Sequence, residues 1–373
     1  MINIGLNIEL FKLRRTVNFQ RYEFNVHQYY PNQYFKNTRT KEVDFTLDII
    51  DLSYSTARTL CAFHLTNREL YFDVIASLLS HLNFIDPTQT NFLLSESRYK
   101  RLRDFSKSTR IGEMAQGINA LFVGQRLDFP YIIDFDLAME RTSTILNIQT
   151  TGKTPDFVVV NRDLVNIGLF ESKGTMSGSA GGGSGYLSKA MEQINDVYHP
   201  CFNFSLPFCS KFAPNNDVNK KPLPKNRKSS INYAFIENIC SAENDNSILL
   251  KLHYASWFYL VGDIDRVNSI LNEGTITTLE NDPRYELDIT TDPKNPIYWV
   301  KSFNVLFSED KELECYLNFY IFLRHKDNFK IGIYKKVIDN LLSNEQSIFE
   351  LPEGEINYLR KYPDGTLIFI RSR

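Results

Sequence analysis

The clearest pattern of apolar and polar positions lies in the middle of the chain. Residues 157–160 and 167–170 are apolar at nearly every position, and the stretch between them is mostly polar. Short apolar runs on either side of a polar turn are typical of strands that are buried on both faces of a sheet. Asp156 stands directly before the first run, and Glu171 and Lys173 follow the second. The pattern therefore predicts two antiparallel strands whose charged ends meet at one edge.

Two helices are predicted around this strand pair. Residues 108–123 predict an amphipathic helix, because apolar side chains recur there at helical spacing. Glu113 lies beside the apolar face, next to small residues that leave room around its carboxylate. A second helix is predicted at 188–198, which contains Gln193 and is ended by Pro200. Helix, strand pair and helix together predict an α/β unit.

The rest of the chain contains further extended and helical segments. We expect strands at 2–11, 42–52, 232–239, 249–261, 298–307, 313–323, 329–334 and 366–370, and helices at 68–82 and 335–342. The predicted fold class is therefore α/β, with a central mixed sheet flanked by helices. The predicted divisions are an N-terminal α+β accessory domain at 1–100, a core at 101–262 and a β-rich C-terminal accessory domain at 263–373.

Composition narrows the class of protein. The chain has 373 residues and a formal net charge of -2, so no basic field covers the whole surface, and contact with nucleic acid requires local patches. The five cysteines are scattered and the six histidines form no metal-spaced pair, which argues against a disulfide framework and a structural zinc site. The N-terminus does not resemble a signal peptide, and the most apolar segments are too short to span a bilayer. We therefore expect a cytoplasmic protein with no membrane partner.

The charged residues at the strand ends suit metal-dependent hydrolysis. Glu171 and Lys173 are two positions apart and point to the same face of a strand, while Asp156 on the antiparallel neighbour lies beside Glu171. Carboxylate oxygens of this kind suit Mg²⁺ or Mn²⁺, which keep several waters. Such an ion polarises a phosphate and lowers the pKa of an attacking water. Lys173 would orient that water or stabilise the developing negative charge.

The order of these features resembles the PD-(D/E)XK nuclease superfamily. The matching residues, in chain order, are Glu113 on a helix, Asp156 in a Pro-Asp pair, Glu171, Ser172 and Lys173 on the next strand, and Gln193 on the following helix. The resemblance covers roughly residues 108–262. It implies a restriction-endonuclease-like core and metal-dependent cleavage of phosphodiester bonds.

The resemblance also implies a role for each matching residue. Asp156 and Glu171 would be carboxylate ligands of the metal, with Glu113 as an additional ligand and the Ser172 carbonyl as a backbone ligand. Lys173 and Gln193 would act in catalysis beside them. Gln193 resembles the glutamine of a Gln-x-x-x-Tyr element, but Tyr198 follows it by five positions instead of four, so the two share a helical face less well. A glutamate near a helix start also has a simpler explanation, because it interacts favourably with the macrodipole.

Three other segments have alternative interpretations. The tripeptide 309–311 is a second Glu-x-Lys, but no Pro-Asp strand precedes it, so the tripeptide alone carries little weight. The glycine-rich stretch 174–186 is either a plain linker or a flexible loop beside the site. The basic stretch 219–230 either contacts phosphates or is a solvated tether.

The predicted function is a metal-dependent nuclease that acts on DNA, with RNA as the second candidate substrate, in restriction or defence against foreign nucleic acid. One alternative is a binding or assembly protein that keeps the nuclease fold without turnover. Another is a nuclease subunit that is inactive until a partner, an ATPase or a sensor, docks on it. Loss of one of the key charged residues would favour the binding protein, but Asp156, Glu171 and Lys173 are all present.

Overall fold

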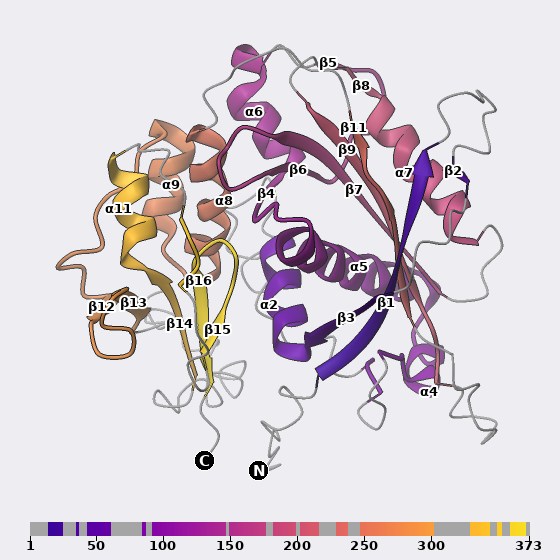
Figure 1. Cartoon of the computed structure of the whole chain (residues 1–373), viewed down its shortest axis with the longest axis horizontal. Helices are drawn as coiled ribbons and strands as arrows, with labels where there is room; N and C mark the ends of the chain where they lie inside the picture. Colours follow the sequence, from indigo (N-terminus) through magenta and orange to yellow (C-terminus); the bar gives the residue numbers. More distant parts are fainter. Residues whose placement is uncertain are drawn as a thin grey trace.

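Two large sheets with helices packed against them form the described part of the chain (Figure 1). The structure is a computed structural model. It describes residues 14–24, 35–36, 43–60, 84–86, 92–146, 149–176, 182–198, 202–215, 229–237, 247–301, 329–343, 349–352 and 359–370. Among the helices in these ranges, none is both long enough and apolar enough to cross a membrane.

The larger sheet is mixed, as predicted, and has nine strands within the described residues. Its main path runs through β2 (Phe35–Lys36), β1 (Arg14–Phe24), β10 (Ser230–Ala234), β9 (Phe204–Phe212), β7 (Ile167–Met176), β6 (Phe157–Val160) and β4 (Tyr131–Asp134), while β3 (Val43–Asp48) pairs with β1 and β11 (Ile236–Glu237) pairs with β9. The strands β4, β6 and β7 are antiparallel, whereas β7 runs parallel to β9 and β10 runs parallel to β1. Strands from the first hundred residues therefore share one sheet with strands of the predicted core.

Helices α5 (Asp104–Arg126) and α7 (Gly182–Asn195) cover opposite faces of this sheet (Figure 1). Ser172 of β7 accepts a hydrogen bond from Asn119 of α5, while the next residue, Lys173, donates one to Gln193 of α7. Successive side chains of a strand point to opposite faces, so the two helices lie on different sides of β7. The expected arrangement of a mixed sheet flanked by helices is confirmed.

Helix α5 packs closely against both the sheet and helix α2 (Ile49–Thr59). A Cβ at Gly174 of β7 would lie 2.5 Å from the carbonyl oxygen of Ile111 in α5. A Cβ at Gly117 of α5 would overlap the side chain of Thr56 in α2. Both glycines are therefore needed for close approach of the backbones.

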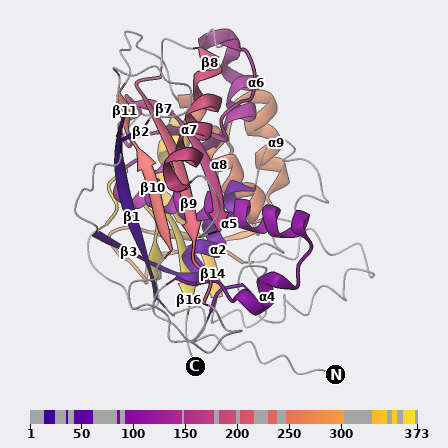
Figure 2. The same cartoon turned by 90° about the vertical axis from the view of Figure 1, so that its right-hand side faces the viewer.

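Short elements complete this part of the chain. They are α4 (Glu96–Lys100), which lies at the N-terminal end of α5 (Figure 2), α6 (Phe135–Leu146), and the paired strands β5 (Gln149–Thr150) and β8 (Val197–Tyr198).

The C-terminal region is built on a second sheet, in agreement with the β-rich module that was predicted. Within the described residues, five antiparallel strands form it in the order β12 (Tyr285–Asp288), β13 (Ile297–Val300), β14 (Phe329–Tyr334), β16 (Thr366–Ile370) and β15 (Leu359–Lys361). The helices of this region are α8 (Ser247–Leu260), α9 (Ile264–Glu273) and α11 (Lys335–Ser343). The turn 363–365 precedes β16, with Gly365 at a φ of 82° that favours glycine.

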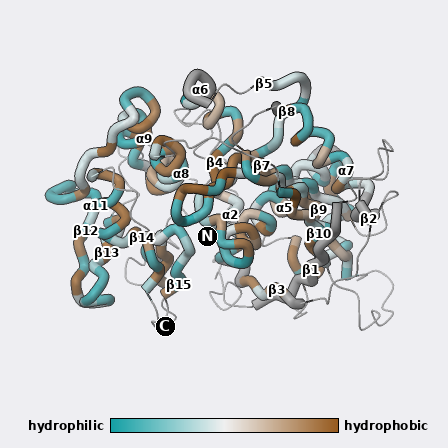
Figure 3. The backbone as a smooth tube through the Cα atoms, turned by 45° about the horizontal axis from the view of Figure 1, so that its top comes forward, coloured by the Kyte–Doolittle hydropathy of each residue, from teal (hydrophilic) through white to brown (hydrophobic). Residues whose placement is uncertain are grey.

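The expectation of a strand at 249–261 is wrong, because helix α8 occupies these residues. Ten of its 14 residues are buried, so the helix has apolar residues around most of its circumference and no polar stripe that would reveal its period. Figure 3 shows the hydrophobic tube around α8 and the neighbouring β4. The apolar run 249–261 is also longer than a typical strand, so its length indicates a helix more reliably than its pattern of apolar residues does.

Other boundaries also differ from the expectations. The segment 42–52 is extended only to Asp48, where α2 begins, and α7 starts at Gly182 instead of residue 188. Four further expectations fall wholly or mainly outside the described residues, namely those for 2–11, 68–82, 313–323 and the basic stretch 219–230.

Candidate active site

The structure brings Asp156, which directly precedes β6, next to Glu171 in the middle of β7, a strand that continues to Met176 beyond the expected end. Phe157 pairs with Phe170 in the antiparallel register, so the residues just outside this pair are opposite each other. The backbone N–H of Asp156 donates a hydrogen bond of 2.8 Å to Glu171 Oε2, and the backbone N–H of Ser172 donates one of 2.9 Å to Asp156 Oδ2. Each carboxylate is thus held by the backbone of the other strand.

Lys173 and Gln193 continue this arrangement on the face covered by α7. The ammonium of Lys173 forms an ion pair with Glu171 and donates a hydrogen bond to Gln193 Oε1. Gln193 Nε2 in turn donates a hydrogen bond of 2.9 Å to the carbonyl of Thr154, just before β6. Glu171 is fully buried, but the Lys173 side chain is 27% exposed, so its ammonium lies at the boundary between the site and solvent.

Polar residues of α5 support the site from the opposite face. The side-chain amide of Gln116 lies near the carboxylate of Asp156 and lowers its pKa. Asn119, one turn further along, donates a 2.8 Å hydrogen bond to Ser172 Oγ and accepts one of 2.7 Å from Ser210 Oγ. Sequence reasoning missed these residues, although an asparagine inside an apolar helical pattern is a usable signal for a buried polar contact.

Burial raises the pKa of both carboxyl groups, and repulsion by Asp156 adds to the rise at Glu171. Burial raises the pKa of Glu171 to about 8, the charge of Asp156 adds to the rise, and Lys173 offsets part of it. Asp156 is half-buried as a residue, but its carboxyl group lies deep enough that burial also raises its pKa, against the hydrogen bond from Ser172, the charge of Lys173 and the nearby side chain of Gln116. The pair therefore carries more negative charge than its surroundings neutralise.

Asp134 is a third carboxylate near the site, and sequence reasoning did not select it. It ends β4 opposite Phe157 and caps α6, since its Oδ1 accepts a 2.9 Å hydrogen bond from Leu137 N–H. Burial raises its pKa to about 6, and the charges of Asp136 and Asp156 contribute to the rise. Like Asp156, Asp134 is an acidic residue next to a short apolar run. This feature of the sequence could have identified it as a candidate.

Glu113 and Tyr198 are not joined to the carboxylate pair by any contact among the described residues. Glu113 lies on α5, and its Oε2 accepts a 2.9 Å ion-pair contact from Arg110. Gln116, one helical turn further on, reaches Asp156 instead. Tyr198 lies on β8, where it pairs with Gln149. The metal role of Glu113 and that of the Ser172 carbonyl stay predictions.

The donor set fits a hard divalent cation held largely by water. No group of three or more His, Cys, Asp or Glu side chains within the described ranges is arranged to hold a metal. Mg²⁺ needs fewer, because it is usually bound through one or two carboxylates and keeps several waters. A cation at Asp156 and Glu171 would also supply the positive charge that their raised pKa values show to be lacking.

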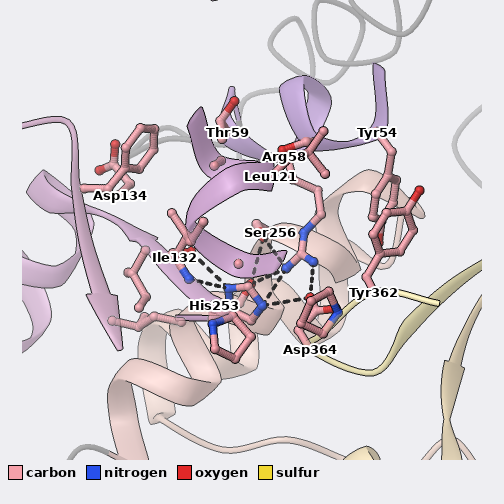
Figure 4. A pocket seen from close by; sticks show the side chains of 18 of the residues that line it. Tyr54, Arg58, Thr59, Leu121, Ile132, Asp134, His253, Ser256, Tyr362 and Asp364 are labelled. Atoms are coloured by element: carbon pink, nitrogen blue, oxygen red, sulfur yellow. Dashed lines mark hydrogen bonds and ion pairs between the residues drawn. The ribbon is translucent and has the colours of Figure 1, made fainter. Parts of the chain in front are cut away.

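A pocket lies beside the carboxylates and is bordered by α2, α5, β4, α8 and the turn before β16 (Figure 4). Asp134 and Phe157 belong to its lining, so it adjoins the site. Its wall also holds Arg58, His253 and Asp364, which point toward one another. Asp364 accepts hydrogen bonds from both of the other two. These charges neutralise each other, in contrast to the carboxyl groups of Asp156 and Glu171, whose pKa values are raised.

Comparison with known proteins gave no match: no protein-family model, no curated protein and no solved structure matches the chain. The basis for a functional assignment is therefore the geometry and charge of the site.

Proposed function

We propose that this chain is a metal-dependent nuclease that hydrolyses phosphodiester bonds, with DNA as the preferred substrate and RNA as the second. The observation that carries the proposal is the Asp156–Glu171 pair, in which the residue before β6 lies opposite the middle of β7, with Lys173 and Gln193 beside it. Two under-neutralised carboxylates next to a lysine form a site for a divalent cation and for an anionic reaction centre.

The order of elements supports the same proposal. Helix α5 is followed by β4, α6 and β5, then by β6 and β7, by α7 and, after β8, by β9 parallel to β7. Within this series, the order of helix α5, strands β6 and β7 and helix α7 is the order on which the resemblance rests. Asp156 directly precedes β6, Glu171 and Lys173 lie on β7, and Gln193 lies on α7.

The residues of the site would divide the work of hydrolysis. Asp156 and Glu171 would hold a divalent cation, which supplies Lewis-acid activation of the phosphate and of a water. Lys173, freed from Glu171, would donate its hydrogen bonds to the attacking water or to a non-bridging phosphate oxygen. Gln193 would fix the position of that ammonium through its own link to the Thr154 carbonyl. Gln116 would orient Asp156 from the other face.

A second candidate is a nuclease subunit that is inactive until a partner binds. It is favoured by the ion pair between Lys173 and Glu171, which occupies both groups before any substrate is present. Glu113 is similarly engaged, by Arg110. Each pair lies within one element, β7 or α5, so a partner would release Glu171 or Glu113 by bringing a group that competes for Lys173 or Arg110.

The direct test is incubation of the purified chain with plasmid, linear and single-stranded DNA and with RNA, in Mg²⁺, Mn²⁺ or EDTA. We expect cleavage that requires the metal and is lost in Asp156→Ala by about a thousandfold or more. Glu286→Ala is the matched control, since this exposed glutamate of β12 lies in the second sheet. Circular dichroism of both variants establishes that the fold is kept.

The outcomes separate the candidates. Cleavage that needs metal and Asp156 supports the nuclease. Cleavage that appears only after addition of cell extract, and again needs Asp156, supports the partner-dependent subunit. Equal activity of Asp156→Ala and the unmodified chain would contradict both.

A further inference from the structure

A basic segment leads toward the candidate active site along α4 and the start of α5. Residues 98–110 contain six cationic side chains, Arg98, Lys100, Arg101, Arg103, Lys107 and Arg110, and one acid, Asp104. The whole chain has 42 Lys and Arg against 44 Asp and Glu. Positive charge is therefore concentrated in this short segment of a chain whose net charge is slightly negative.

The cations of this segment are accessible. Arg98, Lys100, Arg101 and Arg103 are all exposed. Within the described residues, the side chains of Arg101 and Arg103 take part in no ion pair. Lys107 contacts Asp104 at 3.0 Å, but that carboxylate is 99% exposed, so the pair is weak and exchanges readily for another anion.

Helix α5 connects this basic segment to the carboxylates. Lys107, Arg110, Glu113 and Gln116 are spaced by three and form one continuous ridge of the helix surface. The last member of the ridge, Gln116, lies near enough to Asp156 to lower the pKa of its carboxyl group. From Gln116 back to Asp104 the helix rises about 18 Å, which matches about five nucleotide steps of one strand.

We infer that the segment 98–110 binds the phosphate backbone of nucleic acid several nucleotides away from the scissile bond and aligns the strand with the carboxylate pair. The inference rests on the proposed nuclease function and names the path of its substrate. Nucleic acid, with its regularly spaced phosphates, fits these exposed cations. Lys and Arg side chains commonly contact phosphates, and such contacts fix the position of the strand without reading its base sequence. Arg101 and Arg103 supply the contacts farthest from the site.

The test measures binding separately from cleavage. A labelled DNA duplex, longer than the path along α5, is titrated with the chain in EDTA, where no cleavage occurs, and fluorescence anisotropy is recorded between about 50 mM and 200 mM salt. The variant is Arg101→Gln combined with Arg103→Gln. The control is Lys294→Gln combined with Lys336→Gln, which removes two exposed cations from the C-terminal region.

We expect the arginine variant to bind about tenfold or more weakly, with the slope of log K against log salt reduced by about 2. The control should bind like the unmodified chain. Arg98→Gln combined with Lys100→Gln is a second variant, with the same expected direction, which changes α4 and leaves the start of α5 intact. In metal, the arginine variant should lose cleavage at low DNA concentration and recover it at high concentration.

Three results would overturn the inference. They are an unchanged affinity and slope in the arginine variants, an equal loss in the lysine control, and binding of anionic lipid vesicles in place of DNA. None of these results would contradict the proposed nuclease function, because that proposal fails only if metal-dependent cleavage is absent or independent of Asp156.

Discussion

The molecule contains two clusters of buried charge, and they differ in how well they are neutralised. In the candidate active site, Asp156 and Glu171 have raised pKa values, and one lysine, Lys173, serves both. In the second cluster, Asp364 has a pKa well below its usual range, because the charge of Arg58 and a hydrogen bond from His253 outweigh the effect of its burial. The first cluster has too little positive charge for its two carboxylates, whereas in the second cluster Arg58 neutralises Asp364.

The hydrogen bonds explain this difference. Asp364 accepts hydrogen bonds from Arg58, from His253 Nε2 at 2.9 Å and from the backbone and hydroxyl of Thr366 at 3.1 and 2.7 Å. Arg58 also donates to Ser256. A buried ion pair with so many partners is suited to holding elements together. A carboxylate pair without them is suited to binding a cation.

Position in the fold agrees with this division. Arg58 comes from α2, His253 from α8 and Asp364 from the turn before β16, so the cluster ties the two ends of the chain together. His253 Nδ1 lies 3.0 Å from the backbone N–H of Ile132, on the edge strand β4. Burial and the charge of Arg58 lower the pKa of His253, which favours the neutral imidazole.

The largest expected effect is the loss of cleavage in Glu171→Gln without loss of stability. The amide keeps an acceptor for Asp156 N–H but removes the charge that a cation needs, so cleavage should fall by about a thousandfold or more. The free energy of unfolding, measured above about pH 8 by urea denaturation, should rise by about 1 kcal/mol, because a buried like-charge pair is relieved. Glu286→Gln on the exposed face of β12 is the control. A destabilised Glu171→Gln would contradict the contrast drawn between the clusters.

Asp364→Asn should give the opposite result. Removal of one partner leaves Arg58 with an unpaired buried charge, so the free energy of unfolding should fall by about 3–5 kcal/mol. Cleavage per folded molecule, measured below the melting temperature, should stay close to that of the unmodified chain. Asp265→Asn, at a carboxylate that is 86% exposed, should change stability by less than about 0.5 kcal/mol. A loss below about 1 kcal/mol in Asp364→Asn would show that the second cluster does not hold the fold together.

Much of the first cluster was predictable from sequence, because its signals are local. Strands β6 and β7 are short apolar runs, and the antiparallel turn between them fixes which residues are opposite. The alternation of a strand then places Glu171 and Lys173 on one face. Gln193 followed from the order of elements, and its contact with Lys173 is what the structure adds.

The second cluster was not predictable in the same way. Arg58, His253 and Asp364 are separated by more than a hundred residues at each step, and only the tertiary fold brings them together. His253 also lies on α8, which was expected to be a strand because its apolar residues show no helical period. Gln116 and Asp134 were missed for a related reason, since a single polar residue in an apolar segment does not reveal its partner.

The smallest expected effect is a shift in the pH dependence of metal binding when Asp134 is changed to Asn. Glu171 carries a raised pKa, so the folded chain holds a proton that the unfolded chain releases, and stability without metal falls as the pH rises from about 4.5 through about 8. A cation must displace that proton. Affinity for Mg²⁺ or Mn²⁺, measured by titration calorimetry, should therefore rise by up to about tenfold per pH unit below about pH 8 and then level off.

The charge of Asp156 contributes to the raised pKa of Asp134, and because repulsion between two charges is mutual, we expect Asp134 to disfavour the charged form of Asp156. Asp134→Asn keeps an oxygen that accepts the cap hydrogen bond from Leu137 and removes only the charge. The affinity curve should thus move to lower pH by less than about one unit, with the plateau above about pH 8 only slightly lowered. A large drop of the plateau would mean that Asp134 is itself a metal ligand, and the two-carboxylate site would then have to be extended to three. An unchanged curve would mean that solvent screens Asp134 from Asp156, and the charge imbalance of the site would rest on Asp156 and Glu171 alone.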